Sequence, residues 1–388
     1  MAGSGKSLIL ANWAVKLLQK ETKANILVTF FNKGMKNLLE RMLDDACKRH
    51  GVSVSLAKQI RVVHEAAIGN VNEKFDAVFV DEAQDLEASR MVQVYSLCKE
   101  VDKAGRKSKN FVLFHDDSQN IYGQKTLEEF KTELEKSTAT EQRDFADRLS
   151  FQGRSSVLRE TYRSTQAILG FAINMALDPK QIYSQAESGL LVFMKVTELA
   201  EAGLLIRPQD SPDGVYEVRY AERQGTTPIV IQTEKAVALT ELAKEVKHLI
   251  EEEKVAPGSI MVVSIKSPSR VVTELSRVGV PAVAYGGKEG NDPGTLPATR
   301  PDHVRCTTVF SCKGHEAPVV MFANANEIED LSWMQNRPAA QINKIRRCML
   351  YVALSRAMIR LYVFGWKSPL MDAAKAYAGP GTPIQMVS

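Results

Sequence analysis

The chain opens with residue types that can bind phosphate. Gly3-Ser4-Gly5-Lys6-Ser7 precedes an apolar helical pattern over Leu8–Leu18. Backbone N–H groups of such a loop can cradle phosphates, a lysine can reach the β and γ oxygens, and a serine can ligate Mg²⁺. The complete phosphate-loop pattern also has a glycine five residues before Gly5, which would fall before Met1. The short run could therefore also be a chance sequence in a flexible terminus.

A cluster of acidic residues follows an apolar stretch further along the chain. Ala77–Val80 is apolar, and Asp81-Glu82-Ala83-Gln84-Asp85 comes directly after it. A carboxylate at the end of a strand can hold Mg²⁺ opposite a phosphate loop, and its neighbour can orient or deprotonate a water molecule. Acidic residues also occur at strand ends as solvated turn formers. The order of the two runs favours nucleotide chemistry.

Short β-rich apolar runs alternate with amphipathic helical patterns, which predicts an α/β fold with parallel sheets wrapped by helices. Two series of strands, and hence two α/β domains, are expected at Ile26–Phe31, Arg61–His64, Ala77–Val80 and Phe111–Phe114, then at Ile229–Gln232, Ile260–Ile265, Ala282–Tyr285, Val304–Val309, Val319–Ala323 and Arg360–Phe364. Thr126–Arg154 is predicted to be a charged helical excursion. Arg207–Gly214 and Gly286–Pro301 are expected to be loops.

Composition is consistent with a folded protein of this size. The 388 residues are 44% hydrophobic and can bury a substantial core. The 50 Lys and Arg against 46 Asp and Glu give a charge of only +4, which is weak support for nucleic-acid binding. The five cysteines form no C-x-x-C pair, so we expect buried thiols and no zinc site. Without a secretory signal or a membrane-spanning run, we predict a cytoplasmic protein with no membrane partner.

Further motifs follow in a fixed order after the phosphate loop and the acidic run, at Val28–Lys33, His115–Tyr122, Leu158–Ser164, Thr308–Glu316 and Arg346–Ala357. Together they resemble motifs Ia, III, IV, V and VI of superfamily 1 helicases of the UvrD/Rep type. The resemblance implies two RecA-like P-loop domains, at residues 1–157 and 158–371, with an ATP cleft between them and a C-terminal tail at 372–388.

The resemblance also implies roles for individual residues. Gly3, Ser4, Gly5, Lys6 and Ser7 would bind phosphate, Ser7 and Asp81 would bind Mg²⁺, and Glu82 would be the general base. Gln119 would sense the γ-phosphate, and Arg163 and Arg356 would contact it from the second domain. Tyr162 would stack on the adenine, and Glu316 would contact the ribose. Tyr162 could instead pack at a helix start, and Gln119 could cap a turn. Arg346 and Arg347 could be an exposed basic pair, and we expect at least one of them to be exposed.

Residues for nucleic acid follow from the same resemblance. Thr29, Phe31 and Tyr122 are candidates for base stacking or phosphate contacts, with Lys313 on the same path. His64 and His315 are weaker candidates for that path. One of Phe30 and Phe31 must face the core of a buried strand.

The implied function is an ATP-dependent translocase or helicase that moves 3′ to 5′ on single-stranded DNA, with RNA as the less favoured strand. The alternatives are an ATP-gated switch that partners a nuclease or another DNA-processing protein, and a nucleic-acid-binding remnant that does not hydrolyse ATP. The chain departs from the family in lacking the large insertions, so translocation is a safer expectation than duplex unwinding.

Single positions depart from the family as well. Gln124 replaces an aromatic residue, Phe310 and His315 replace the usual histidine and leucine of motif V, and His115 replaces a glycine of motif III. No adenine-recognition segment or opening strand precedes the phosphate loop. We therefore expect the first sheet to lack a central strand, which would leave two unpaired edges and an apolar face exposed.

Overall fold

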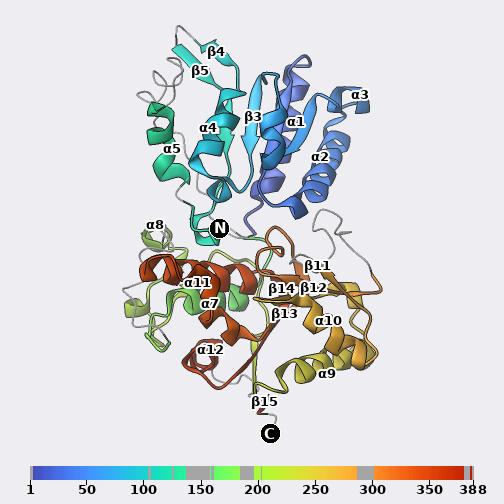
Figure 1. Cartoon of the computed structure of the whole chain (residues 1–388), viewed down its shortest axis with the longest axis vertical. Coiled ribbons are helices and arrows are strands. Elements are labelled where there is room, and N and C mark those ends of the chain that lie inside the picture. Colours follow the sequence, from blue (N-terminus) through green and yellow to red (C-terminus); the bar gives the residue numbers. More distant parts are fainter. Residues whose placement is uncertain are drawn as a thin grey trace. The chain divides into compact units, whose positions relative to one another are not determined.

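The computed structural model describes residues 3–103, 106–124, 126–136, 158, 161–183, 196–201, 203–285, 301–379 and 385–386. They belong to two compact units, each of the α/β class with a parallel sheet (Figure 1). The N-terminal unit comprises Gly5–Asp116 and Tyr122–Leu158. The C-terminal unit comprises Met1–Ser4, Asp117–Ile121 and Arg159–Ser388. The predicted α/β fold with parallel sheets is confirmed.

The main sheet of the N-terminal unit has four described strands, all parallel. Their order is β2 (Ile60–His64), β1 (Ile26–Phe30), β3 (Ala77–Val80) and β6 (Phe111–Leu113). All four lie where the apolar runs predict strands. The expected gap in the middle of the sheet is wrong, because β3 pairs directly with β6 and the described strands form one continuous ladder. The strand β6 is the outer strand on that side, and its residues are half-buried.

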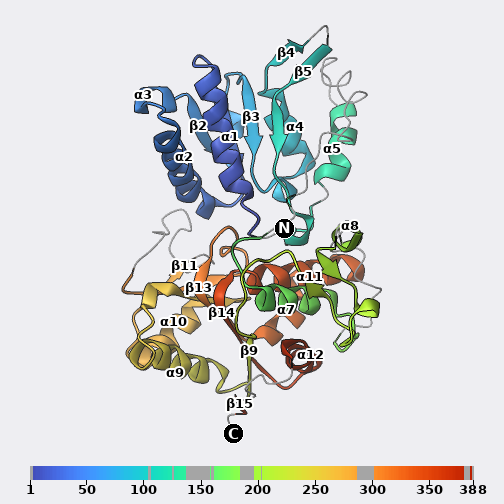
Figure 2. The same ribbon diagram turned by 180° about the vertical axis from the view of Figure 1, so that it is seen from behind.

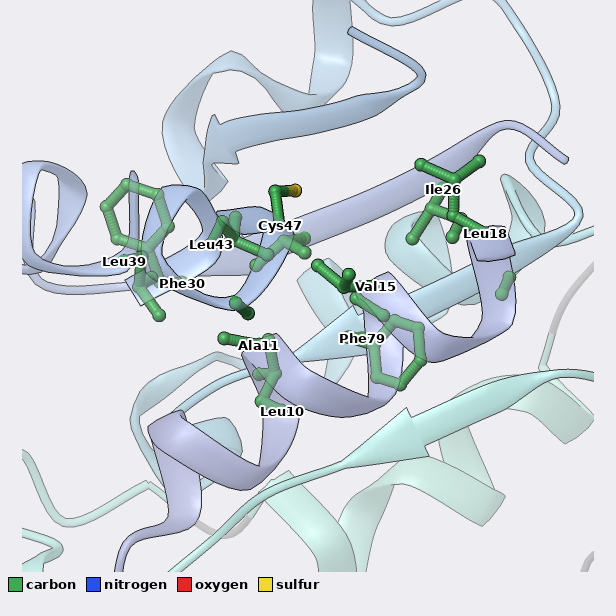
Figure 3. Packing of buried hydrophobic residues seen from close by; sticks show 14 of the residues in the cluster. Leu10, Ala11, Val15, Leu18, Ile26, Phe30, Leu39, Leu43, Cys47 and Phe79 are labelled. Carbon is green, nitrogen blue, oxygen red and sulfur yellow. The ribbon is translucent and has the colours of Figure 1, made fainter. Parts of the chain in front are cut away.

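Helices cover both faces of this sheet. The helices α1 (Lys6–Lys20) and α2 (Lys36–His50) pack together on one face, where Leu10, Val15 and Leu39 meet Phe30 and Phe79 from the strands (Figure 3). The apolar residues of α1 recur at the three- and four-residue spacing of a buried helical face. Because each such side chain contributes about 1.5–3 kcal/mol when it is buried, this face holds α1 against the sheet and fixes the position of its N-terminus.

The opposite face is covered by α4 (Ala88–Ser96) and α5 (Thr126–Glu135). Between the main elements lie η1 (Lys33–Met35), α3 (Val54–Ala57), η2 (Glu65–Asn70) and η3 (Ala83–Asp85). An antiparallel pair, β4 (Glu100–Lys103) and β5 (Arg106–Lys109), has no counterpart in the predicted strands. Its charged sequence lacks the apolar alternation on which strand prediction depends.

The C-terminal unit contains a larger sheet, and its seven described strands are all parallel. Their order is β11 (Ala282–Tyr285), β12 (Val304–Thr308), β10 (Ile260–Ser264), β13 (Ala317–Ala323), β14 (Ala357–Trp366), β9 (Ile229–Thr233) and β15 (Gln385–Met386). The first six lie where strands are predicted. The strand β10 is buried along its whole length, as expected for a parallel strand with both faces covered.

Two groups of helices cover this sheet. The helices α9 (Ala238–Glu251) and α10 (Pro268–Arg277) lie on one face, and α7 (Gln166–Leu177), α11 (Ala339–Leu354) and α12 (Pro369–Ala378) lie on the other (Figure 2). Residues 372–378 were placed in a C-terminal tail by sequence analysis, but they continue α12 with a buried apolar face.

Smaller elements complete the C-terminal unit: η4 (Asp117–Gln119), α8 (Val196–Glu201), β7 (Leu205–Ile206), η6 (Pro208–Asp210), β8 (Glu217–Val218), η7 (Pro257–Ser259), η9 (Ala325–Glu329) and η10 (Ser332–Met334). Most of the predicted loop at 286–301, residues 137–154 of the predicted excursion, and Arg159 and Glu160 of motif IV lie outside the described residues. In the part of the chain that the structure describes, no helix combines the length and apolar character needed to cross a membrane.

Candidate nucleotide and nucleic-acid sites

Two glycines shape the loop ahead of α1. Gly3 and Gly5 have φ angles of 73° and 80°, in the left-handed region that favours glycine. A Cβ atom on Gly3 would lie 2.6 Å from both Arg163 Cβ and Thr161 Oγ1. Gly5 is the N-cap residue of α1 and has no side chain with which to cap the helix. A loop with these properties ahead of a helix is suited to receiving an anion such as phosphate.

The first helical residues meet the acidic run that follows β3. Ser7 Oγ donates a hydrogen bond to Asp81 Oδ2 over 2.7 Å, and the Glu82 N–H donates to Asp81 Oδ1 over 3.1 Å. Burial, and then the neighbouring charge of Glu82, raises the pKa of Asp81 to about 6, while Ser7 and Lys6 act in the opposite direction. Glu82 has a φ of 48°. Such strained backbone is often found at functional sites.

A chain of polar contacts joins Lys6 to Glu82. Lys6 Nζ lies 3.3 Å from Asp116 Oδ2, and the Asp116 N–H donates to Gln84 Oε1 over 2.8 Å. Gln84 Nε2 donates in turn to Glu82 Oε2. Sequence analysis gave no role to Asp116 or Gln84. Both lie inside the recognised motifs, but the contacts of Asp116 with Lys6 and with Gln84 join residues that are far apart in the sequence.

The possible metal ligands near the N-terminus of α1 suit Mg²⁺ better than a metal ion whose ligands all come from protein. Ser7 and Asp81 provide hard oxygen ligands, and Glu82 adds negative charge. Among the described residues, no group of three or more His, Cys, Asp or Glu side chains is arranged to hold a metal ion. Mg²⁺ commonly uses one or two carboxylates and takes its other ligands from substrate phosphates and water.

In the C-terminal unit, two buried cations hold Gln119. Arg356 is 1% exposed, and its Nη2 donates to Gln119 Oε1 over 2.9 Å. Its Nε donates to the Val352 carbonyl. Lys313 is fully buried, and its Nζ donates to the Gln119 carbonyl over 2.7 Å. The ammonium group of Lys313 is thus directed at Gln119, and its predicted contact with nucleic acid stays a prediction.

The structure also brings together other residues predicted to bind ATP. Arg163 Nε forms an ion pair with Glu316 Oε2. Tyr162 is 56% exposed, and its N–H donates to the Gly3 carbonyl over 3.2 Å. Arg305, which sequence analysis did not single out, is buried in β12 and donates from Nη2 to the Glu316 carbonyl over 3.0 Å.

Positive charge surrounds His315. Burial, followed by the charges of Arg305, Arg356 and Arg163, lowers the pKa of His315 to about 4, and Glu316 acts weakly in the opposite direction. The Nε2 atom of His315 is buried. This histidine is therefore neutral near pH 7, and its ring is half-buried among these arginines.

Of the nucleic-acid candidates in the N-terminal unit, the two aromatic residues lie together. The ring centroids of Phe31 and Tyr122 are 4.8 Å apart, and both side chains are partly exposed. Phe30 is in the core, with its ring 5.5 Å from that of His64. Thr29 is fully buried, so the structure does not place it where a nucleic-acid strand can reach it. Phe31 and Tyr122 remain the candidates.

A second aromatic pair, which sequence analysis missed, lies in the C-terminal unit. The ring centroids of Phe310 and Trp333 are 5.6 Å apart, and Trp333 is 56% exposed. The Val309 N–H donates to the Ser264 carbonyl over 3.0 Å, so Phe310 lies at the carboxyl ends of β10 and β12. In open parallel sheets, ligands bind beyond these strand ends.

A hollow of about 220 Å³ lies at the same strand ends and is lined by residues that include Ser264, Lys266, Ser267, Arg270, Asn324 and Glu327. Ser267 begins α10, and its side chain does not cap the helix. Lys266 forms an ion pair with Asp330 at 2.6 Å. Cationic side chains and a helix N-terminus therefore meet in one hollow.

The paired arginines of motif VI have structural partners. Arg347 is buried and donates from Nη1 to the Ala176 and Leu177 carbonyls at the end of α7. Arg346 is half-buried and donates to the Ile328 and Glu329 carbonyls of η9. The expectation that at least one of the pair is exposed is therefore wrong.

Comparison with known proteins relates this chain to one protein family. No curated protein gives a significant match. Among solved structures, the chain is similar to the C-terminal domain of a possible DNA helicase from Lactobacillus plantarum WCFS1, with 18% identity, a TM-score of 0.30, and coverage of 55% of this chain and 93% of that one. This likeness is too weak to support an argument. The sequence profile described as "Schlafen group 3, DNA/RNA helicase domain" matches residues 1–202. Since this match covers more than half of the 388 residues, the chain belongs to the Schlafen group 3 DNA/RNA helicase domain family.

Proposed function

We propose that this protein is an ATP-dependent motor of the UvrD/Rep type that moves on a single strand of nucleic acid. The observation that carries the proposal is the hydrogen bond between Ser7 and the buried Asp81, next to Glu82 and at the N-terminus of α1. Membership of a helicase family supports action on nucleic acid.

The N-terminal unit supplies the residues for hydrolysis. We assign the β and γ phosphates to Lys6, the metal ion to Ser7 and Asp81, and the attacking water to Glu82, whose carboxylate is oriented by Gln84. A bound Mg²⁺ would neutralise charge on the phosphate oxygens. The contact between Lys6 and Asp116 holds the lysine in place before nucleotide binds.

The C-terminal unit supplies groups that can respond to the γ-phosphate. Guanidinium groups stabilise the charge that spreads over a transferring phosphoryl group, and we assign this role to Arg163 and Arg356. Glu316, which pairs with Arg163, would receive the ribose hydroxyl. A phosphate would compete with Glu316 for Arg163, so nucleotide binding and release of this ion pair are expected to be linked.

The two aromatic pairs support binding of a single strand. Phe31 with Tyr122, and Phe310 with Trp333, offer partly exposed rings on which bases can stack without sequence preference. Lys266, Arg270 and the N-terminus of α10 suit the phosphate backbone. The motif resemblance favours DNA as the strand.

Steady-state ATP hydrolysis with Mg²⁺, with and without single-stranded DNA, tests the proposal. We expect turnover that rises when the strand is added and that is lost in Lys6→Met. Lys16→Met changes an exposed lysine on the same helix and should behave as the wild type. A rate of hydrolysis that does not change when single-stranded DNA is added would contradict a motor and favour an ATP-gated switch. A folded protein that binds the strand but never hydrolyses ATP would be a remnant.

A further inference from the structure

Asn324, directly after β13, has a buried side-chain acceptor. The residue is 8% exposed, and its Nδ2 donates to Glu327 Oε1 over 3.3 Å. An ionised carboxylate only accepts hydrogen bonds, so this contact fixes the orientation of the amide. Asn324 Oδ1 is then buried, and within the described residues it receives no hydrogen bond. Because an unsatisfied buried acceptor is costly, Asn324 Oδ1 is available to a donor from outside the chain.

The backbone at Asn324 points to the same conclusion. Its φ is 49°, in the left-handed region. Glycine would adopt this conformation without strain, and asparagine tolerates it better than most residues. What asparagine adds at this position is therefore its side-chain amide. Left-handed residues other than glycine often occur at ligand-binding sites.

The surroundings of Asn324 limit what the donor can be. Asn324 lines the hollow of about 220 Å³, a volume that includes space open to solvent, so the sugar and phosphate of a nucleic-acid strand can approach it from outside. Lys266, Arg270 and the N-terminus of α10 suit the phosphate. The base would lie towards the nearby Phe310 and Trp333 rings.

Within a nucleic-acid strand, only ribose has a free hydroxyl group that can donate a hydrogen bond. The 3′ and 5′ oxygens of an internal nucleotide are esterified to phosphate, so neither can donate a hydrogen bond. The 2′-hydroxyl of RNA can, and DNA has no hydroxyl at this position. We propose that Asn324 Oδ1 accepts a hydrogen bond from the ribose 2′-hydroxyl of a strand in this hollow, so that the protein prefers RNA to DNA, in contrast to the DNA preference that the motif resemblance alone implies. This inference rests on the proposed function and adds the sugar as the determinant of strand choice.

Equilibrium binding tests the preference. Labelled oligonucleotides of uridine, deoxyuridine and 2′-fluoro-deoxyuridine, equal in length, carry the same base, so contacts to the base cancel. We expect the uridine strand to bind about 3- to 10-fold more tightly than the deoxyuridine strand, the range that one net hydrogen bond supplies. The 2′-fluoro strand keeps a ribose-like pucker but cannot donate, and it should bind like deoxyuridine.

Two variants locate the effect. Asn324→Gly removes the acceptor, suits the left-handed backbone, and should make the three strands bind equally. Lys266→Ala is the matched control and should weaken all three strands by one common factor, because it removes a charge and not a sugar contact. The wild-type comparison of uridine with 2′-fluoro-deoxyuridine is decisive even if Asn324→Gly folds poorly.

Equal binding of uridine and deoxyuridine strands by the wild type would overturn the inference, as would a preference that persists in Asn324→Gly. If the strands still stimulate ATP turnover in that case, the proposed function stands and only the role of Asn324 fails. If no strand binds at all, the proposed function fails together with the inference.

Discussion

At the scale of single residues, two adjacent carboxylates have different surroundings. Asp81 is fully buried and accepts hydrogen bonds from Ser7 and from the Glu82 N–H. The Glu82 carboxylate is instead held by Gln84. This difference separates a metal-binding role from a water-activating role, as proposed above.

Changing Glu82 to Gln should keep ATP binding but slow hydrolysis by at least ~100-fold, the usual scale for losing a general base. The amide has nearly the same shape, but it cannot accept a proton from water. Single-turnover hydrolysis and nucleotide affinity measure the two effects separately. Glu87→Gln, at an exposed position before α4, is the control. Normal hydrolysis by Glu82→Gln would refute the assignment.

His315 should make the C-terminal unit sensitive to acid. Its pKa is lowered to about 4 by burial and by Arg305 and Arg356, so it stays neutral when folded. In the unfolded chain its pKa is about 6.5. Below that pH the unfolded state gains a proton that the folded state does not bind, so stability falls progressively from about pH 6.5 towards pH 4.

The test compares free energies of unfolding for the wild type and His315→Gln at about pH 7 and pH 5, on either side of the histidine's ordinary pKa. The variant has no proton to gain and should lose less stability on acidification. An identical loss in both proteins would show that His315 titrates normally.

At the scale of elements, Arg347 joins two helices on one face of the larger sheet. It lies in α11, and its guanidinium satisfies carbonyl groups at the end of α7. Helix ends leave carbonyls without intrahelical partners, and a buried end requires them to be satisfied by another group. This arginine of motif VI therefore supports the fold, whereas Arg356 holds Gln119.

Arg347→Met should lower the free energy of unfolding by about 1.5–3 kcal/mol, the usual range for hydrogen bonds to a charged group. Arg346→Met is the matched control and should cost less, because Arg346 is only half-buried. Urea denaturation gives both values. ATP turnover per folded molecule should be unchanged in both variants, and a turnover defect at full stability would instead indicate a direct role for Arg347.

At the scale of the whole molecule, the predicted nucleotide-binding residues are distributed over both units. Gly3 belongs to the C-terminal unit and Gly5 to the N-terminal unit. Asp117–Ile121, which contains Gln119, also belongs to the C-terminal unit, although the residues before and after it belong to the other. Gln119 thus lies three residues after Asp116, the partner of Lys6, and is a hydrogen-bond partner of Arg356.

Single-stranded nucleic acid should stimulate ATP turnover, whereas blunt duplex should be unwound poorly. Stimulation is expected because strand binding can bias the conformation that assembles the contacts for hydrolysis. Poor unwinding is expected because the sequence lacks the large insertions and has Gln124 in place of an aromatic residue. Turnover with strands of several lengths and a duplex-unwinding assay measure the two properties.

Arg356→Ala should abolish the stimulation and change strand affinity little, because its guanidinium contacts Gln119 and not the exposed aromatic pairs. Its melting temperature must be checked, since the side chain is buried. Turnover that is the same for every strand length would contradict the coupling. Efficient processive unwinding by the wild type would show that the insertions are not needed for it.

Local patterns in the sequence were enough to locate most of the described sheet strands. Parallel strands buried on both faces are continuous apolar runs, and such runs can be recognised without knowing what packs on them. The cysteines were also predictable, since all five are buried thiols that form no disulfide. The order of the motifs indicated a helicase before any contact was known.

Tertiary structure decided which side chains meet. Lys313 belongs to a recognised motif, yet its ammonium group donates a hydrogen bond to the Gln119 carbonyl, which is far away in the sequence. The contact of Lys6 with Asp116 and the burial of the Asn324 amide oxygen also depend on elements that are distant in the chain. Hydrogen bonding and burial are properties of a three-dimensional neighbourhood, and no local spacing of residue types encodes them.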